Sequence, residues 1–245
     1  MDLKYHLDQE HQLSPSAQHI SEIIYGGIDG IITTFAVVAW FAGAWSENHL
    51  AQLWSLSVVL FGLANLFGDW VSMALGKYLA TRSEQDLYHT AWAKEWYEIK
   101  NHTLFEHEEC VEILKEQGMS YDHAHQLVWL MSHYPDIWIK WMMDNELHLS
   151  DTRQENAMIQ GLITFFSFIF FGAIPLLPYL FWYTEDHWTI SVVMTLIALM
   201  MLWFVRRYIT RQSLIYTMMQ ILILGIVAAW VAYGTGFLVI TYFWT

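Results

Sequence analysis

Charged residues are scarce in this sequence: Asp, Glu, Lys and Arg together make up 14% of its 245 residues. A soluble protein carries roughly a quarter charged residues. The deficit is uneven, because the acids and bases gather in residues 77–156 while long apolar runs stand on either side. Apolar residues reach 56%, with 14 Trp, 13 Tyr and 14 Phe among them. This pattern predicts one part of the chain in lipid and another part in water.

Cysteine and basic residues are also few. The single Cys110 excludes an intrachain disulfide, and a lone thiol is more often a small buried residue than a metal ligand. Eleven Lys and Arg against 24 Asp and Glu give a formal charge of −13, which argues against a nucleic-acid partner. The first eighteen residues lack the basic start and apolar stretch of a cleavable signal. We therefore expect the first membrane helix to be retained.

Five apolar segments are long enough to cross a bilayer core of about 30 Å, which needs about 20 residues per helix. They are Ile23–Trp45, Leu50–Gly76, Ala157–Tyr183, Trp188–Val205 and Ser213–Trp244. Tryptophans stand near the segment ends, where an interfacial aromatic belt would place them: Trp45, Trp54, Trp182, Trp188 and Trp203. We expect an all-α polytopic membrane protein with five transmembrane helices. Its parts are an N-terminal segment 1–22, helices 1–2 in 23–76, a helical domain in 77–156 and helices 3–5 in 157–245.

Basic residues indicate the orientation. If the N-terminus lies inside, all eleven Lys and Arg fall on the inner side, in 1–22, 77–156 and 206–212. The outer loops near 46–50 and 184–188 contain acids and no base. The positive-inside rule then predicts a cytoplasmic N-terminus and acidic domain, with the C-terminus outside.

Residues 77–117 contain neither Pro nor Gly, and Gly118 is a helix-stop signal, so we expect one long helix. At about 100° per residue, one stripe of roughly 80° collects five side chains: Glu95, Glu98, His102, Glu106 and Glu109. Like charges at this spacing repel one another. A shared divalent cation would remove that repulsion, since carboxylate oxygens suit hard or borderline ions. The alternative is a solvated acidic face, which Glu108, Glu112 and Glu116 fit.

Two shorter helices are expected at about 120–132 and 135–145, with Ser120 as a possible N-cap and Pro135 near a helix start. The second ends in WMMDNEL, where Met142, Met143 and Glu146 share a broad face. Adjacent methionines usually fill a core. They gain interest as ligands if Glu146 faces the acidic stripe.

Two carboxylates stand within the apolar segments or at their edges. Asp29 lies in YGGIDGI among glycines, where helix backbones can approach closely. Asp69 lies in NLFGDWVSM and shares a helix face with Asn65 and Met73. An ionised side chain facing lipid costs several kcal/mol, so such residues normally face a pathway or a partner. The alternatives are an interfacial helix start for Asp29 and a hydrogen bond to a neighbouring helix for Asp69. Oxygen and sulfur ligands together favour Fe²⁺ or Mn²⁺ over Mg²⁺ or Ca²⁺.

Three stretches resemble the membrane segments of the vacuolar iron transporter family: IIYGGIDGIITTFAVVAWFAGA, SMALGKYLATRSEQDLY and FGAIPLLPYL. The resemblance runs from about Ile20 to the end of the fifth segment and includes the five-span layout with an inserted cytoplasmic domain. It implies a secondary active transporter for divalent iron, or also manganese, rather than an enzyme. It further implies a homodimer with the path at the subunit interface, exchange of the ion for protons, and binding of Fe²⁺ (with Mn²⁺, Co²⁺ and Zn²⁺ as further candidates) as substrate.

The resemblance also implies a ligand set in the inserted domain. The family pattern of two E-x-x-E pairs corresponds to Glu95, Glu98, Glu106 and Glu109, and its M-M-x-x-x-E pattern to Met142, Met143 and Glu146. His102 is an additional candidate. In the membrane, Asp29 and Met73 match the family, while Asn65 stands where plant members have Glu. We expect Asp69 to supply that carboxylate, and Lys77 stands where the family usually has a small or acidic residue.

Two rival functions differ in class. A membrane-anchored di-iron oxidase or ferritin-like store usually uses Glu-x-x-His on paired helices, and no Glu here has a His three residues later. A metal sensor or scaffold would bind ions in the acidic domain and use the membrane part as an anchor, which leaves Asp29 and Asp69 unexplained. On the resemblance, we expect export of Fe²⁺ from the cytoplasm in exchange for protons. The short loops suggest a bacterial cytoplasmic membrane.

Overall fold

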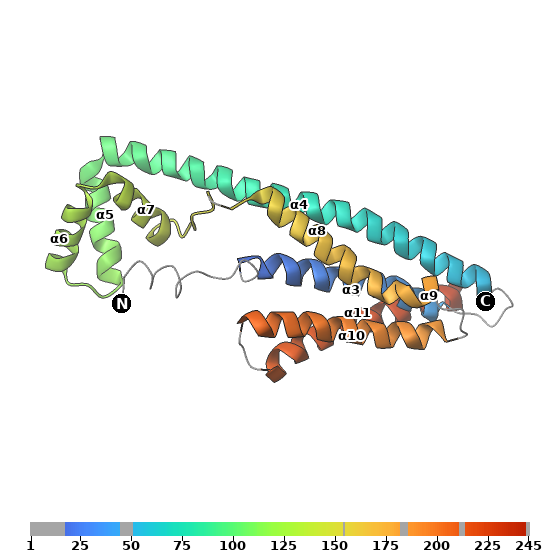
Figure 1. Ribbon diagram of the computed structural model, residues 1–245. Helices are drawn as coiled ribbons and strands as arrows, with labels where there is room; N and C mark the ends of the chain where they lie inside the picture. Colours follow the sequence, from blue (N-terminus) through green and yellow to red (C-terminus); the bar gives the residue numbers. More distant parts are fainter. Residues whose placement is uncertain (1–17, 45–50, 154, 182–185, 211–213, 244–245) are drawn as a thin grey trace, which may run out of the picture. The chain divides into compact units, whose positions relative to one another are not determined.

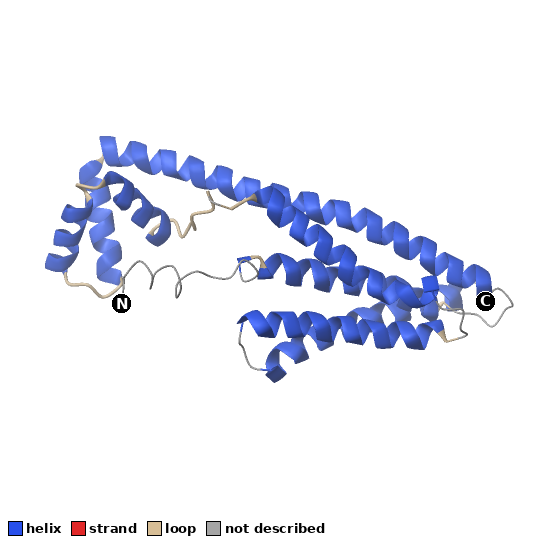
Figure 2. Ribbon diagram, in the orientation of Figure 1, coloured by secondary structure: helices blue, strands red, loops and turns tan. Residues whose placement is uncertain are grey.

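The computed structural model describes residues 18–44, 51–153, 155–181, 186–210 and 214–243, and most of these residues lie in helices (Figures 1 and 2). Within these ranges there is no strand, so the all-α prediction is confirmed. The expectations placed on Lys4, Trp45, Trp182, Arg211 and the acidic loops near 46–50 and 184–185 lie outside the described residues. The chain divides into an apolar unit, Met1–Tyr78 with Met158–Thr245, and an acidic unit, Leu79–Ala157.

The apolar unit is built from α3 (Ile20–Gly43), the first part of α4 (Ala51–Asn101), α8 (Ala157–Ala173), η1 (Ile174–Leu176), α9 (Leu177–Phe181), α10 (His187–Thr210) and α11 (Leu214–Phe243). Among the described residues, five helical stretches are long and apolar enough to cross a membrane. At about 1.5 Å per residue, the 51 residues of α4 extend well beyond a 30 Å bilayer core. Its apolar stretch ends before Lys77, and the rest of the helix belongs to the acidic unit.

The third apolar segment is not one continuous α-helix, because α8 gives way at Ile174 to a 3-10 turn and then to α9. Pro175 lies at the start of that turn and Pro178 follows in α9. Proline has no N–H to donate to the preceding turn and its ring clashes with that turn's carbonyl. The Ser191 hydroxyl of α10 donates a hydrogen bond of 2.7 Å to the Pro175 carbonyl, which ties the interruption to the neighbouring helix.

Helix α3 packs closely against α8 and α11 through glycines, which lets backbones approach one another. A Cβ on Gly30 would clash with the Phe168 carbonyl oxygen of α8, and one on Gly26 would lie 2.6 Å from the Thr164 carbonyl oxygen. At the other end of α3, Gly43 lies equally close to the backbone of Tyr233 in α11. The sequence supplies glycine where two helix backbones meet.

Replacing Gly30 with Ala is expected to destabilise the protein by about 1–3 kcal/mol, because the new methyl group meets a backbone carbonyl that cannot rotate away. The matched control is Gly68→Ala in α4, where nothing lies within 4 Å of the new Cβ. There the greater helix propensity of alanine should leave stability unchanged or slightly higher. Thermal unfolding in detergent measures the stability of both variants. An equal change in the unfolding temperature of the two would contradict the close packing of α3 on α8.

The acidic unit contains the remainder of α4, α5 (Thr103–Glu116), α6 (Tyr121–Met131) and α7 (Pro135–Asn145). The expected single helix over 77–117 is wrong, because α4 ends at Asn101 and a new helix begins after His102. The predicted stop at Gly118 is confirmed by its φ of 98°, a left-handed conformation that glycine adopts without strain. The two shorter helices form as expected, with Ser120 at the N-cap position and Pro135 in the first turn of α7.

The acidic unit has its own hydrophobic core. Its fully buried members include Trp138, Ile139, Met142 and Met143 of α7, packed with residues of α4, α5 and α6. The amide of Gln85 in α4 donates to the backbone carbonyls of Thr152 (3.1 Å) and Glu155 (2.7 Å), which fixes the segment after α7 against α4. This core holds α4, α5 and α7 in a defined arrangement around the acidic residues described next.

Candidate metal centre

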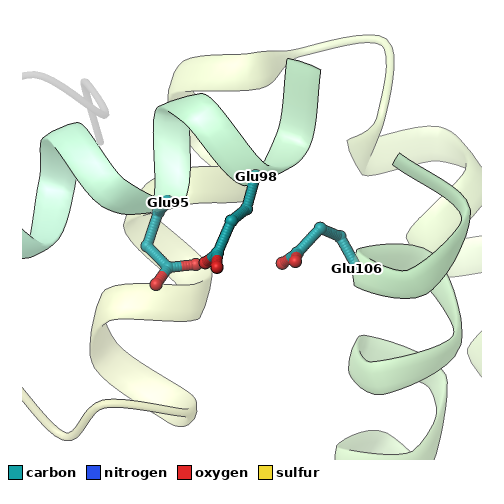
Figure 3. Close-up of side chains that lie close together, drawn as sticks. All are labelled: Glu95, Glu98 and Glu106. Atoms are coloured by element: carbon teal, nitrogen blue, oxygen red, sulfur yellow. The ribbon is translucent and has the colours of Figure 1, made fainter. Parts of the chain in front are cut away.

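The break at His102 changes how the acidic residues meet. On a single helix they would form a stripe, with Glu95 and Glu106 far apart along its axis. Because α4 ends and α5 departs in a new direction, Glu106 of α5 instead faces Glu95 and Glu98 of α4 (Figure 3). The sequence pattern identified these residues, and the turn brings them together.

Two groups of three carboxylates result. Ligand atoms of Glu95, Glu98 and Glu106 lie within 4.8 Å of one another, and the same holds for Glu106, Glu109 and Glu146. Glu106 belongs to both groups, so five glutamates from α4, α5 and the end of α7 form one connected cluster. We call these five residues the carboxylate cluster. Oxygen ligands at this spacing suit a hard or borderline divalent cation.

The cluster is shielded from water on one side and open on the other. Glu95 is fully buried and Glu106 is 6% exposed, whereas Glu109 is exposed. Both Glu95 oxygens and Glu146 Oε2 are buried without a hydrogen-bond partner. Buried carboxylate oxygens normally have partners. Among the described residues the basic side chain nearest to them is Lys94, whose Nζ lies 3.8 Å from Glu95 and 3.1 Å from Glu98. A divalent cation bound here would satisfy these oxygens.

Burial raises the pKa of Glu95, Glu106 and Glu146 to about 7 each. Removal of the carboxylates from water is the largest cause in all three, and repulsion from neighbouring glutamates adds to it, while Lys94 lowers each pKa. Near neutral pH the cluster therefore holds protons that an incoming cation would displace.

The other predicted ligands of the acidic unit differ in their surroundings. Met142 and Met143 are fully buried in the hydrophobic core, where adjacent methionines are ordinary filling residues. Their role as ligands stays a prediction from the resemblance. His102 is exposed at the turn and belongs to neither carboxylate group. The buried Cys110 thiol accepts a hydrogen bond of 3.1 Å from Trp138 Nε1, and burial raises its pKa to about 12, so it stays protonated.

The predicted residues of the apolar unit lie on α3 and α4. Asn65 donates a hydrogen bond of 2.9 Å to Asp69 Oδ2, and Asp29 is near enough to Asp69 for their carboxylates to repel each other. Met73 is half-buried one turn further along α4. Two interacting acids and an amide offer oxygen ligands, and the role of Met73 as a sulfur ligand stays a prediction.

One charged pair in the apolar unit escaped the sequence reading. Lys77 Nζ lies 3.0 Å from Glu22 Oε1, and the Glu22 side chain is 2% exposed. In the sequence Lys77 is a departure from the family pattern, whereas Glu22 belongs to a polar N-terminal segment and carries no motif. Glu22 stands seven residues before Asp29, on the same face of α3, and that spacing was the available signal.

Comparison with known proteins adds independent evidence. The sequence profile of the VIT family matches residues 20–237. A vacuolar iron transporter of Centaurea cyanus is 30% identical over 234 residues, which cover 94% of this chain and 92% of the relative. Vacuolar iron transporter 2 of Oryza sativa subsp. japonica is 31% identical over 216 residues, covering 88% and 85%. A vacuolar iron transporter of Toxoplasma gondii is 30% identical over 238 residues, covering 93% and 76%. Since the profile spans most of the chain and these relatives align over most of their own lengths, this protein belongs to the VIT family.

Proposed function

We propose that this protein transports divalent iron across a membrane and that the carboxylate cluster collects the ion. The observation that carries the proposal is the meeting of five glutamates around Glu106, with buried oxygens that lack partners. The names of the relatives, vacuolar iron transporters, agree with a metal ion as substrate. Iron is the first choice and Mn²⁺ the second, since carboxylates accept both ions.

The ion path in this proposal runs along α3 and α4. Its ligands are Asp29 on α3 and Asn65, Asp69 and Met73 on α4. Most other residues of these two helices are apolar within the span. The hydrogen bond from Asn65 holds the Asp69 carboxylate in place for the ion. Here Asp69 supplies the charge that the amide of Asn65 cannot.

All five apolar helices cross the bilayer in the proposed topology, with the acidic unit in the cytoplasm. Basic residues at Lys77, Arg82, Arg206 and Arg207 mark the cytoplasmic ends of the spans. Transport then runs out of the cytoplasm of a bacterial cell, across its cytoplasmic membrane. Most of the apolar stretch of α4 is uncovered by the rest of the chain, which leaves room for a second copy in a homodimer.

Proton antiport completes the proposal. A carboxylate that releases a divalent cation regains affinity for protons, so protonation on the return step can drive the cycle. Asp29 and Asp69 are the acids that would carry this exchange, because they stand within the apolar helices.

Replacing Asp29 with Ala is expected to lower Fe²⁺ flux into liposomes by roughly tenfold or more, since it removes a charge from the path. A tenfold loss corresponds to about 1.4 kcal/mol. The assay follows Fe²⁺ entering the vesicles together with the internal pH. The control is Asp86→Ala, an exposed acid on α4 beyond its apolar stretch, which should keep wild-type flux.

The same assay separates the rival functions. Wild-type flux in Asp29→Ala would remove Asp29 from the path. Oxygen consumption on adding Fe²⁺, without flux, would indicate an oxidase. Ion binding without flux or oxidation would indicate a sensor.

A further inference from the structure

Glu22 and Lys77 form an ion pair at one end of the proposed path, and each stands two helical turns from a proposed path residue on its own helix. Glu22 lies two turns before Asp29 on α3, about 11 Å along the axis. Lys77 lies two turns after Asp69 on α4, about 12 Å along its axis. The ion pair joins the two helices at one level, and at the other level the carboxylates of Asp29 and Asp69 are near enough to interact electrostatically.

Helix α8 holds α3 and α4 at the level of this pair. A Cβ on Gly26 of α3 would lie 2.6 Å from the Thr164 carbonyl oxygen, and one on Gly161 of α8 would lie 2.8 Å from the Ala74 carbonyl oxygen of α4. The Ser167 hydroxyl of α8 also donates a hydrogen bond of 2.6 Å to the Ile23 carbonyl. Because the backbones of α3, α4 and α8 are close-packed here, the positions of Glu22 and Lys77 on their helices are held relative to each other.

The Glu22 carboxylate is only half satisfied. One oxygen, Oε1, accepts from Lys77, while Oε2 is buried without a hydrogen-bond partner. Lys77 is different, because 29% of its side chain is exposed and its four-carbon stem is flexible. The lysine can therefore swing away while the carboxylate stays, which leaves an anionic site for another cation.

We propose that Glu22 and Lys77 are a gate at the end of the path nearest the acidic unit in sequence, with the Lys77 ammonium as a tethered competitor that the divalent ion displaces from Glu22. This inference rests on the proposed transport function. It assigns two residues outside the expected ligand set: Glu22 is a transient ligand, and Lys77 sets the ion concentration at which the path opens. It also gives Lys77, where a small or acidic residue is expected, a definite role.

The decisive measurement is the concentration dependence of Fe²⁺ flux in Lys77→Met, which keeps the length of the side chain and removes its charge. The apparent KM should fall by about tenfold, because no tethered cation competes for Glu22. Lys77→Arg should retain the wild-type KM, and Lys140→Met, an exposed lysine of the acidic unit, is the matched control. An unchanged KM in Lys77→Met would overturn the gate. A lower maximal rate without a lower KM would instead mark the pair as a structural tie between α3 and α4.

A double variant tests whether Lys77 acts through Glu22. In Glu22→Gln the carboxylate is gone, so adding Lys77→Met should no longer lower the KM. A fall of the same size in the single and double variants would show that Lys77 acts on another group and would contradict the proposal.

An accessibility measurement judges the gate without transport. Met73→Cys, in a Cys110→Ala background, places a thiol one turn inside Lys77 on α4. A small cationic thiol reagent should modify it several-fold faster when Lys77 is Met. If wild-type protein moves no Fe²⁺, the proposed transport function fails while this labelling still tests the gate. If the protein transports Fe²⁺ but neither the labelling rate nor the KM changes in Lys77→Met, the gate is contradicted while the transport function stands.

Discussion

Replacing Glu106 with Gln should weaken binding of a divalent ion by at least a hundredfold, more than replacement of any other single glutamate in the carboxylate cluster. Glu106 alone belongs to both groups of carboxylates, so the change removes one charged ligand from each. Loss of a residue that merely supports a ligand already costs roughly tenfold to a hundredfold in metal affinity. Mn²⁺ is a suitable probe because it resists oxidation in air, and calorimetry on the full-length protein gives its affinity.

Two variants frame this result. Glu109→Gln touches one group only and should weaken binding about tenfold less than Glu106→Gln. Glu112→Gln is the control, because Glu112 is exposed, pairs with Lys115 at 2.6 Å and stands outside both groups. Similar small losses in all three variants would mean that the acids form only a solvated face, the alternative that the spacing alone left open.

The fold was largely predictable where the signal is compositional. Apolar length identified the long helices of the apolar unit, since a lipid environment requires about twenty such residues. Gly118 and Pro135 marked a helix end and a helix start, because their backbone preferences are local properties. Such local preferences are similar in the unfolded chain and in the folded protein, so the sequence alone predicts them.

The turn at His102 could not be predicted in the same way. Residues 98–106 contain no Gly or Pro, and their propensities permit a continuous helix. The break follows from tertiary packing, since Ile99 of α4 and Cys110 of α5 must both reach the core around Trp138. Burial in that core outweighs the few hydrogen bonds that a straight helix would keep.

The candidate site shows the same division. Helical spacing grouped Glu95, Glu98, Glu106 and Glu109 on one stripe, whereas in the structure they come together because α5 turns away from α4. The shared position of Glu106 and the partnerless oxygens of Glu95 depend on where α5 turns, which no spacing reveals. The pairing of Glu22 with Lys77 needs two helices more than fifty residues apart in sequence to meet.

The second large expected effect is a dependence of the protein's stability on pH in the absence of metal, caused by the carboxylate cluster. Glu95, Glu106 and Glu146 have pKa values near 7 in the folded protein, above the ordinary value of 4.5 that an unfolded chain would show. Between these values the folded state holds more protons than the unfolded state. The free energy of unfolding should therefore fall as pH rises from about 4.5 to 7 and change little above that range.

Metal binding should show the opposite dependence on pH. An ion that binds the cluster displaces protons, so its affinity increases as pH rises through 7. Each displaced proton contributes roughly tenfold between pH 6 and 7.5, and three together would contribute up to about a thousandfold. The carboxyl of Asp151 contributes nothing here, because the adjacent Arg153 holds its pKa at about 2 and it stays ionised throughout.

Thermal unfolding of the full-length protein at pH 5.5 and pH 8 tests both statements together. With a chelator present, the midpoint should be lower at pH 8, where the buried carboxylates are charged and repel one another. With excess Mn²⁺ the order should reverse, because the ion binds the folded state far more tightly at the higher pH. Calorimetry in two buffers of different ionisation enthalpy counts the released protons, and Glu106→Gln should release one fewer. Binding that is equally tight at pH 6 and 7.5 would mean that the ion does not reach these three glutamates.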